Sequence, residues 1–289
     1  MDTEKIYIKG WEIERFREYL QEKENSSLTI EKYVRDDRTF LGFLGQDRRI
    51  DKERLLSYKE WLTGRYAVSS VNSMLAALNQ FLSFMELGRL KLRRIRVQRT
   101  DMGQTEKALS RDEFRKLVCT ARENNKAQIA MIMETMCATG IRVSELKFFR
   151  VENVRTGIVR VWNKGKHRMV LLPAVLKKKL LLYMKKNNIR SGMIFRTKGG
   201  KEKDRSNIWK EMKQVAKCAG IELKKVFPHN LRHLFARTFY RKTKNLINLA
   251  DILGHSSIEV TRIYTTEGIE EWRRCLEKLD LLEDIKTTT

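Results

Sequence analysis

A run of basic residues divides the apolar patterning of this 289-residue chain into two parts. The run, GRLKLRRIRVQR, spans residues 88–99 and has no broad apolar face, and the polar stretch TDMGQTEK follows it. A block of like charges without an apolar face is usually extended and solvated, and it often binds a polyanion. We therefore predict a basic linker over residues 89–107 between two domains, with a solvated tail of the preceding helix as the alternative for its first residues.

Residues 8–88, ahead of this linker, show the apolar spacing of a small helical bundle. The last of four expected helices repeats apolar residues at a four-three-four-three spacing, which places them on one stripe. The stripe comprises Val71, Leu75, Leu78, Leu82 and Met85. A first helix is expected to carry Trp11, Ile13, Phe16 and Leu20, a second follows the capping residues Ser26 and Ser27, and a third spans residues 51–63.

Residues 108–289 are expected to form a second domain in which helices alternate with one β-hairpin. A capping box, Ser110-x-x-Glu113, opens it, and the apolar segment AQIAMIMETMCATG is expected to be a helix that ends at a left-handed Gly140. The segments GIVRVW and HRMVLLP are expected to be two strands joined at Lys164-Gly165, because glycine tolerates the positive φ of such turns. Further helices are expected near 174–187, 205–219, 228–243 and 246–253. The predicted fold class is thus mainly α, with a helical first domain and an α+β second domain holding a small sheet.

The charge balance points to a nucleic acid partner. The chain has 60 Lys and Arg against 36 Asp and Glu, a formal charge of +24. Such an excess favours polyanions and steers association with them. The basic residues run along the whole chain rather than along one amphipathic helix, so no membrane partner is expected. The sequence shows no apolar stretch of signal or membrane-spanning length, and a cytoplasmic protein is expected.

The cysteines give no sign of a disulfide framework or a metal site. Cys119, Cys137, Cys218 and Cys275 stand far apart, with no C-x-x-C pair and no histidine at metal-ligand spacing. We expect buried, inert thiols, and neither a metal nor another cofactor.

Four separated clusters contain the residues of most chemical interest, and each has a structural explanation when taken alone. The clusters are ATGIRVSEL at 138–146, NKGK at 163–166, PHNLRH at 228–233 and LGHSSIEVTRIY at 253–264. Arg142 can form an ion pair with Glu145 at a helix start. A histidine and an arginine at 229 and 232 share one helix face, and His255 can simply occupy a helix corner. An isolated tyrosine such as Tyr264 is normally a packing residue.

Taken together, the clusters supply the groups that attack a phosphodiester without a metal. Arg142 and Arg232 can bind phosphate oxygens and stabilise the charge of a pentacoordinate transition state. A tyrosine hydroxyl, with an ordinary pKa of about 10, needs a neighbouring base or a strongly positive site to react near neutral pH. His229 is the best candidate for the base. Lys164 on the hairpin is our candidate for the acid that protonates the departing sugar oxygen.

In order and content, these clusters resemble the signature of the tyrosine recombinase or phage integrase family, in particular its Xer-like bacterial members. ATGIRVSEL resembles the first arginine box, PHNLRH the His-x-x-Arg box, and LGHSSIEVTRIY the second histidine with the nucleophilic tyrosine. The resemblance covers the second domain closely, and it extends to the N-terminal helices only in their arrangement. It implies a SAM-like core-binding domain over 8–88 and a catalytic domain with a C-terminal helix over 108–289.

The resemblance also implies the active-site residues. These are Arg142, Lys164, His229, Arg232, His255 and Tyr264, with Glu145 as a supporting residue beside Arg142. The hairpin NKGKHR is shorter than the GKGNKxR form common among Xer relatives, which leaves Lys166 as an alternative general acid. The chain starts almost directly at the core-binding helices, so the additional arm-binding domain of some phage integrases is not expected.

The reaction implied by the resemblance is DNA strand transfer without a cofactor. Tyr264 would form a 3′-phosphotyrosine bond, and four protomers would act on two DNA duplexes through a Holliday junction. The C-terminal helix GIEEWRRCLEKLDLLE would dock on a neighbouring protomer through an apolar stripe that includes Trp272, Leu276, Leu279 and Leu282, or on its own domain. A catalytically silent DNA-binding protein of the same fold and a type IB topoisomerase-like enzyme are the alternatives.

Contacts with the DNA backbone are expected from the basic linker, because phosphate contacts position a protein on the duplex. The candidate residues are Arg89, Lys91, Arg93, Arg94, Arg96 and Arg99. Basic residues of the 196–213 region, among them Arg205 and Lys210, are weaker candidates.

Overall fold

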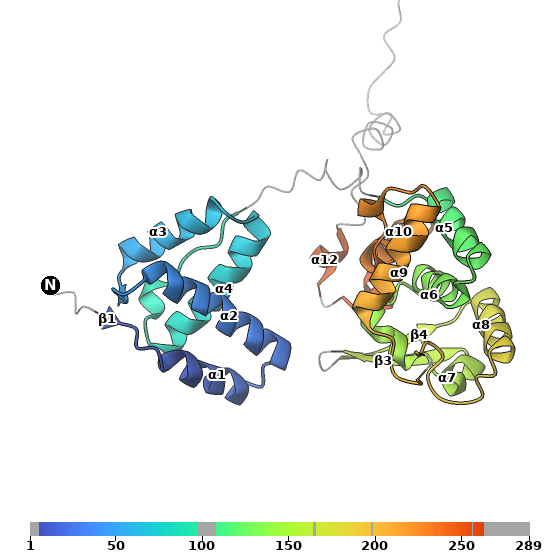
Figure 1. The fold of residues 1–289 in the computed structure, drawn as a ribbon, viewed down its shortest axis with the longest axis horizontal. Helices are drawn as coiled ribbons and strands as arrows, with labels where there is room; N and C mark the ends of the chain where they lie inside the picture. Colours follow the sequence, from blue (N-terminus) through green and yellow to red (C-terminus); the bar gives the residue numbers. More distant parts are fainter. Residues whose placement is uncertain (1–5, 97–107, 164–165, 198, 256, 263–289) are drawn as a thin grey trace, which may run out of the picture. The chain divides into compact units, whose positions relative to one another are not determined.

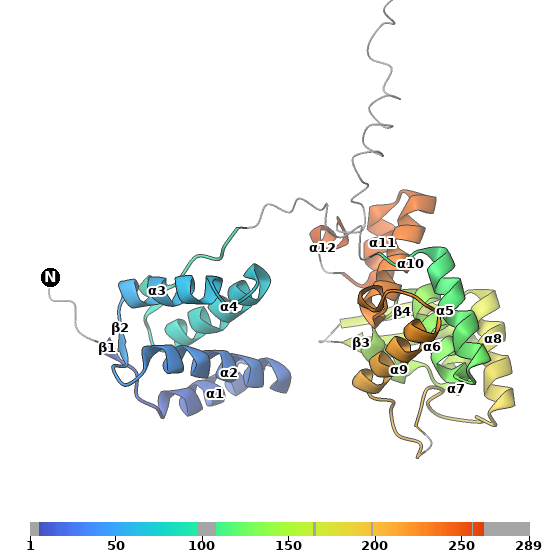
Figure 2. The same cartoon turned by 45° about the horizontal axis from the view of Figure 1, so that its top comes forward.

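The computed structural model describes residues 6–96, 108–163, 166–197, 199–255 and 257–262. The chain forms two compact units, Met1–Arg99 and Thr100–Thr289. Both are mainly helical, and each holds one two-stranded antiparallel sheet (Figures 1 and 2). Among the described helices, none combines the length and the apolar character that a membrane crossing requires. The predicted fold class, mainly α with a small sheet in the second unit, is confirmed.

The first unit is a four-helix bundle with a short β-bridge between its start and its middle. Its elements are β1 (Ile6–Tyr7), α1 (Glu12–Glu22), α2 (Ser27–Leu44), β2 (Arg49–Ile50), α3 (Lys52–Thr63), α4 (Val68–Phe84) and the 3₁₀ turn Gly88–Leu90. Ser26 caps α2 by accepting a hydrogen bond from the Thr29 amide, and Asp51 caps α3 in the same way through the Arg54 amide. The expected helix starts are therefore set by local capping.

The apolar stripe predicted for the last helix forms the centre of this bundle. Val71, Leu75, Leu78 and Leu82 are all buried in one core, whereas Met85 lies beyond the end of α4 and is only partly buried. Trp11 departs from the prediction, because it occupies the N-cap position of α1 and is 50% exposed. The helix begins one residue after it, so its ring does not lie on the buried face with Phe16 and Leu20.

The basic segment, residues 88–96, packs along the first unit, where we expected the start of a solvated linker. The Asn79 side chain accepts from the Leu92 amide at 2.8 Å and donates to the Leu92 carbonyl at 2.9 Å. Asn72, two turns earlier on α4, makes the same pair of bonds with Ile95, at 2.8 and 2.9 Å. Leu92 is buried in the core. Amide side chains and two apolar residues therefore fix a segment whose sequence is otherwise dominated by charge.

This docking leaves the basic side chains of the segment exposed. They are Arg89, Lys91, Arg93, Arg94 and Arg96. Arg99 lies outside the described residues. The backbone of the segment is thus held while its cations face solvent.

The second unit surrounds a central apolar helix. Its elements are α5 (Arg111–Glu123), α6 (Ala127–Thr139), the 3₁₀ helix η3 (Val143–Phe148), α7 (Val151–Thr156), β3 (Ile158–Asn163), β4 (Lys166–Leu171), α8 (Ala174–Lys186), α9 (Arg205–Cys218), η4 (Leu223–Lys225), α10 (Pro228–Thr243), α11 (Leu246–Leu253) and α12 (Ile258–Arg262). Helix α6 contacts α5, α8, α9 and α10, and Figure 1 shows it in the middle of this unit. Its sequence is apolar almost all round, as expected for a buried helix.

Local signals in the sequence fix the ends of several of these elements. The capping box of Ser110 and Glu113 is present at the start of α5. Strands β3 and β4 pair antiparallel from Ile158 with Leu171 to Asn163 with Lys166, as expected for a hairpin. The turn residues Lys164 and Gly165 lie outside the described residues.

The expectation of buried thiols is wrong for two of the three described cysteines. Cys119 and Cys218 are exposed and Cys137 is partly buried, while Cys275 lies outside the described residues. Cys119 and Cys218 occupy the solvent-facing sides of α5 and α9, whose buried faces are formed by other apolar residues.

Gly140 ends α6 in a left-handed conformation with a φ of 66°. A Cβ atom there would lie 2.5 Å from the Phe235 ring and 2.8 Å from a Leu253 methyl group. We predict that Gly140→Ala lowers the free energy of unfolding of this unit by about 2–4 kcal/mol, since both the backbone strain and the overlap add to the cost. Amide hydrogen exchange in α6 measures this.

Gly220→Ala is the matched control for this prediction. Gly220 has a similar φ of 62° with nothing within 4 Å of the added Cβ, so only the backbone cost of about 1 kcal/mol is expected. Equal losses in the two variants would show that the Phe235 contact does not matter.

Candidate active site

Arg142 is placed by the turn that follows the buried helix α6. After the glycine cap at Gly140, the chain extends to Arg142 and enters η3. The Glu145 carboxylate accepts from the Arg142 amide at 2.8 Å and from the Arg142 Nη1 at 3.2 Å. Glu145 is 1% exposed and the Arg142 side chain 37%. The carboxylate therefore anchors the base of an arginine whose guanidinium remains accessible.

Arg232 reaches the same place from α10, and it is the largest fully buried side chain in the described part of the molecule, at 1% exposure. Its Nη1 donates to the Gly140 carbonyl at 2.5 Å, and its Nη2 donates to the Leu253 carbonyl at 2.8 Å. These carbonyls end α6 and α11, so one guanidinium joins two helix C-termini. Each terminus carries unsatisfied carbonyls and a partial negative charge, which compensates for the burial of the cation.

His255 lies beside Arg232 through the corner that follows α11. The Arg232 Nη2 is 2.9 Å from the His255 Nε2, and the His255 Nδ1 is 2.9 Å from the Thr261 hydroxyl. Because an arginine can only donate, Nε2 must be the acceptor, and the imidazole proton is assigned to Nδ1. His255 is therefore neutral in this arrangement and donates to Thr261.

The electrostatic surroundings agree with a neutral His255. Burial, followed by the charges of Arg232 and Arg142, lowers the pKa of His255 to about 4. Both effects disfavour an additional positive charge among these arginines.

His229 lies one turn before Arg232 on α10, which begins with Pro228. Burial, followed by the charges of Arg232 and Arg142, lowers the pKa of His229. Its ring lies edge-on to that of His233, with ring centroids 4.5 Å apart. Burial, followed by His229, lowers the pKa of His233 to about 4. A neutral imidazole at position 229 is able to accept a proton, as the base of the predicted chemistry must.

The lowered pKa values of His233 and His255 predict that the free energy of unfolding of the second unit falls in acid. In the unfolded chain a histidine binds a proton near pH 6.5, whereas folded His233 binds one only near its pKa of about 4. Between these values the unfolded state binds more protons, so the free energy of unfolding falls as the pH falls. The slope is at most about 1.4 kcal/mol per pH unit for His233, and smaller for the more exposed His255 because of solvent screening.

Amide hydrogen exchange in α10, measured from pH 7 to pH 4.5, tests this prediction. His233→Asn is expected to flatten the pH dependence relative to the unchanged chain. Parallel curves for the two proteins, or greater stability at the lower pH, would contradict it.

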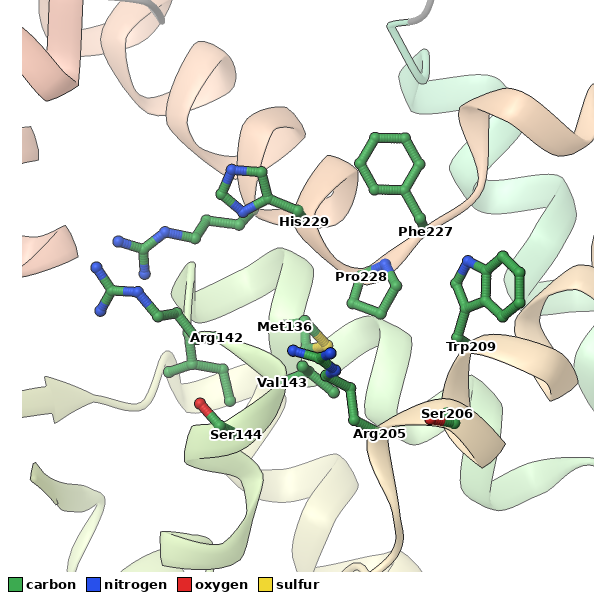
Figure 3. A pocket seen from close by; sticks show the side chains of 12 residues that line it. Met136, Arg142, Val143, Ser144, Arg205, Ser206, Trp209, Phe227, Pro228 and His229 are labelled. Carbon is green, nitrogen blue, oxygen red and sulfur yellow. The ribbon is translucent and has the colours of Figure 1, made fainter. Parts of the chain in front are cut away.

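A cleft of about 520 Å³ opens beside Arg142, His229 and Arg232. Figure 3 shows Arg142 and His229 next to one another on one side, with Trp209 and Phe227 on the other. Arg205 and Ser206, at the start of α9, also line it. The cleft thus combines cations and hydroxyls with aromatic rings, a lining that suits phosphates and the apolar faces of sugars or bases.

The structure brings together five of the residues that were singled out from the sequence: Arg142, Glu145, His229, Arg232 and His255. Lys164 and Tyr264 lie outside the described residues. Lys166 is described only as the first residue of β4. Within the described residues, no three His, Cys, Asp or Glu side chains gather as metal ligands.

Sequence reasoning missed two residues of this site. Arg168, on β4, donates to the Glu145 carboxylate at 2.6 Å and to the Ile252 carbonyl at 2.8 Å. His233 packs on His229. For His233, its position directly after the His-x-x-Arg pattern was a usable signal, since one turn of helix places it beside His229. Arg168 ends the quoted hairpin motif NKGKHR, as an arginine ends the GKGNKxR form, but its partners Glu145 and Ile252 lie too far away in the sequence for the motif to reveal them.

Comparisons with known proteins identify the family of this chain. The model of the phage integrase family matches residues 107–270, more than half of the chain, and that of the phage integrase N-terminal SAM-like domain matches residues 13–87. Tyrosine recombinase XerA of Pyrococcus furiosus is 28% identical over 284 residues, which cover 94% of this chain and 95% of the relative.

Solved structures show the same likeness. A crystal structure of XerA recombinase aligns with a TM-score of 0.53 at 25% identity, covering 94% of this chain and 98% of the other. A lambda integrase tetramer bound to a Holliday junction aligns with a TM-score of 0.71 at 16% identity, covering 91% and 78%, and this second likeness concerns the fold alone. The family match, together with the convergence of the two arginines and two histidines, places this chain in the phage integrase family, that is, among the tyrosine recombinases.

Proposed function

We propose that this protein is a site-specific DNA recombinase that cuts and rejoins DNA through a covalent bond to Tyr264. The Tyr264 oxygen attacks a scissile phosphorus and displaces the 5′ oxygen of the next nucleotide, which leaves a 3′-phosphotyrosine and a free 5′-hydroxyl. The hydroxyl of the partner duplex then attacks the phosphotyrosine and releases the tyrosine. Each step exchanges one phosphoester bond for another, so no external energy source is required.

One observation carries this proposal: Arg142, His229, Arg232 and His255 converge from three separate segments of the chain beside one cleft. Arg142 and Arg232 would bind the non-bridging phosphate oxygens and stabilise the charge that grows in the transition state. Burial of Arg232 strengthens this effect, since a charge acts more strongly where water is excluded.

Proton transfer is assigned to the neutral histidines and to the hairpin. His229 would accept the proton of the tyrosine hydroxyl, which its lowered pKa and neutral state permit. Thr261, the partner of His255, precedes Tyr264 by three residues in the sequence. Lys164 would protonate the leaving 5′ oxygen, and Lys166 is the alternative donor two residues later.

The assembly that we propose has four protomers on two DNA duplexes, with a Holliday junction as the intermediate, in the cytoplasm. The exposed cations of the basic segment would bind DNA phosphates, together with Arg99. The C-terminal helix, which carries Trp272, Leu276, Leu279 and Leu282, would dock on a neighbouring protomer.

The test is a search for the covalent intermediate. Duplexes bound by the protein are selected from a random-sequence pool, and a nick is then placed beside the cleavage position so that the short 5′-hydroxyl fragment diffuses away. We expect the protein to remain linked to the 3′ side of the break. A bound duplex that never yields this adduct would favour a silent DNA-binding protein, whereas an adduct without exchange between two labelled sites would favour a topoisomerase-like enzyme.

A further inference from the structure

Arg168 joins three parts of the second unit that are distant in sequence. It lies on strand β4, and its side chain is 12% exposed. One amino group, Nη2, donates to the Glu145 carboxylate at 2.6 Å, and the other, Nη1, donates to the Ile252 carbonyl at 2.8 Å. The hairpin, the start of η3 and the last turn of α11 are therefore connected through a single guanidinium.

The backbone that carries His255 also packs directly on the stem of Arg168. Gly254 has a φ of 65°, and a Cβ atom at that position would lie 2.5 Å from the Arg168 Cδ and 3.0 Å from its Nε. Only a glycine allows this approach. Arg168 thus contacts the corner before His255 through its stem as well as through its hydrogen bond to Ile252.

Arg168 also affects the charge balance between Glu145 and Arg142. The Glu145 carboxylate, 1% exposed, faces two arginines, and its contact with the Arg168 Nη2 at 2.6 Å is shorter than its contact with the Arg142 Nη1 at 3.2 Å. A buried carboxylate needs a paired cation to remain charged. Because Arg168 supplies one, the charge of Arg142 is not cancelled by Glu145.

We propose that Arg168 is a positioning residue, which neutralises Glu145 and fixes the corner before His255 so that Arg142 keeps its charge for the phosphate. Without Arg168, Glu145 would compete with the phosphate for the Arg142 guanidinium. This inference rests on the proposed strand-transfer function. It assigns no contact between Arg168 and DNA.

Single-turnover formation of the covalent adduct on the nicked duplex, at saturating protein, tests the proposal. Arg168→Met is expected to slow the adduct about 10–100-fold, the usual range for a group that orients an active-site residue, while the affinity for DNA changes less than about 3-fold. The matched control is Arg160→Met, which removes a cation from the exposed face of the same hairpin and is expected to react at the unchanged rate.

A second change distinguishes charge balance from a general loss of structure. Arg168→Met combined with Glu145→Gln removes the uncompensated carboxylate as well, so the double variant is expected to react at least about 5-fold faster than Arg168→Met alone. A double variant that is no faster than the single variant would overturn the charge argument. A single variant with the unchanged adduct rate would overturn the whole proposal.

The state of His255 provides a readout that a merely structural role would not change. Arg232, Arg142, Arg168 and His229 all lower the pKa of this histidine. In Arg168→Met the pKa of His255 is expected to rise. An NMR titration of the four histidines measures this pKa, and the His255→Asn variant identifies which signal belongs to His255. An unchanged titration in a folded variant would count against the proposal.

Two outcomes separate this inference from the function on which it rests. If the unchanged chain forms no adduct, the proposed function fails, whereas an adduct that is insensitive to Arg168 leaves that function intact and defeats only this inference. Should Arg168→Met fail to fold, Arg168→Lys replaces it. A lysine keeps the charge but cannot hold Glu145 and Ile252 together in the same geometry, so a slowing of about 3–10-fold is expected, and the unchanged rate would contradict the proposal.

Discussion

Tyr264→Phe is expected to abolish the covalent adduct, by at least about 10⁴-fold, while leaving DNA binding intact. The substitution removes only the hydroxyl oxygen, which is the atom that would form the bond to phosphorus. The arginines that we propose to bind the phosphate are unaffected, so the affinity for DNA should change less than about 3-fold. Adduct formation on the nicked duplex and a binding titration at one fixed salt concentration measure the two effects.

Tyr240→Phe is the control for this variant, because it removes a tyrosine hydroxyl from α10 on the same unit without touching the site. It is expected to form the adduct at the unchanged rate. An adduct that survives in Tyr264→Phe would show that another side chain is the nucleophile.

Arg232→Lys is expected to slow adduct formation about 10²–10³-fold, the size of effect seen when one donor to a developing oxyanion is lost. A lysine keeps the positive charge but not the planar fork, which here reaches two helix ends and His255 at once. The variant should also lose stability, since the Gly140 or Leu253 carbonyl is left without its donor at a cost of about 1–3 kcal/mol. Reaction rates are therefore compared well below the unfolding temperature.

Arg237→Lys separates catalysis from stability. Arg237 is also on α10, is partly buried and donates to the Leu109 carbonyl at 3.1 Å, but it does not line the cleft. We expect it to lose stability while its rate stays within about 3-fold of the unchanged chain. A rate for Arg232→Lys within tenfold of the unchanged chain would rule out a major role of its guanidinium in the transition state.

Much of the framework was predictable because the responsible signals are local. The capping box of Ser110 and Glu113 lies within one turn of helix, and Gly140 ends α6 through its own backbone conformation. The hairpin and the helices after it follow from the switch in apolar period. The site residues Arg142, His229, Arg232 and His255 were recognisable because each stands in a short motif whose chemistry makes sense with the others.

The remaining features depend on contacts over long sequence distances. Arg168 ends the hairpin motif NKGKHR, but its partners Glu145 and Ile252 lie on other elements, so the motif alone does not indicate that its side chain is buried between them. The docking of the basic segment depends on two asparagines of α4, a residue type that usually points to turns. The composition of the basic segment indicated a solvated linker, but hydrogen bonds between its backbone and the two asparagines fix it against the first unit.

The hydrogen bonds of Asn79 to Leu92 and of Asn72 to Ile95 fix the basic segment to the first unit. Fewer residues therefore remain as the tether between the two units that we propose to bind DNA. Once one unit is bound to a duplex, the other meets that duplex as an intramolecular ligand, with an effective concentration that is higher for a shorter tether of sufficient reach. Cations held on a fixed backbone also lose less conformational freedom on binding than cations on a loose chain. If both units bind DNA as proposed, Asn72 and Asn79 would add to avidity by holding this segment in place.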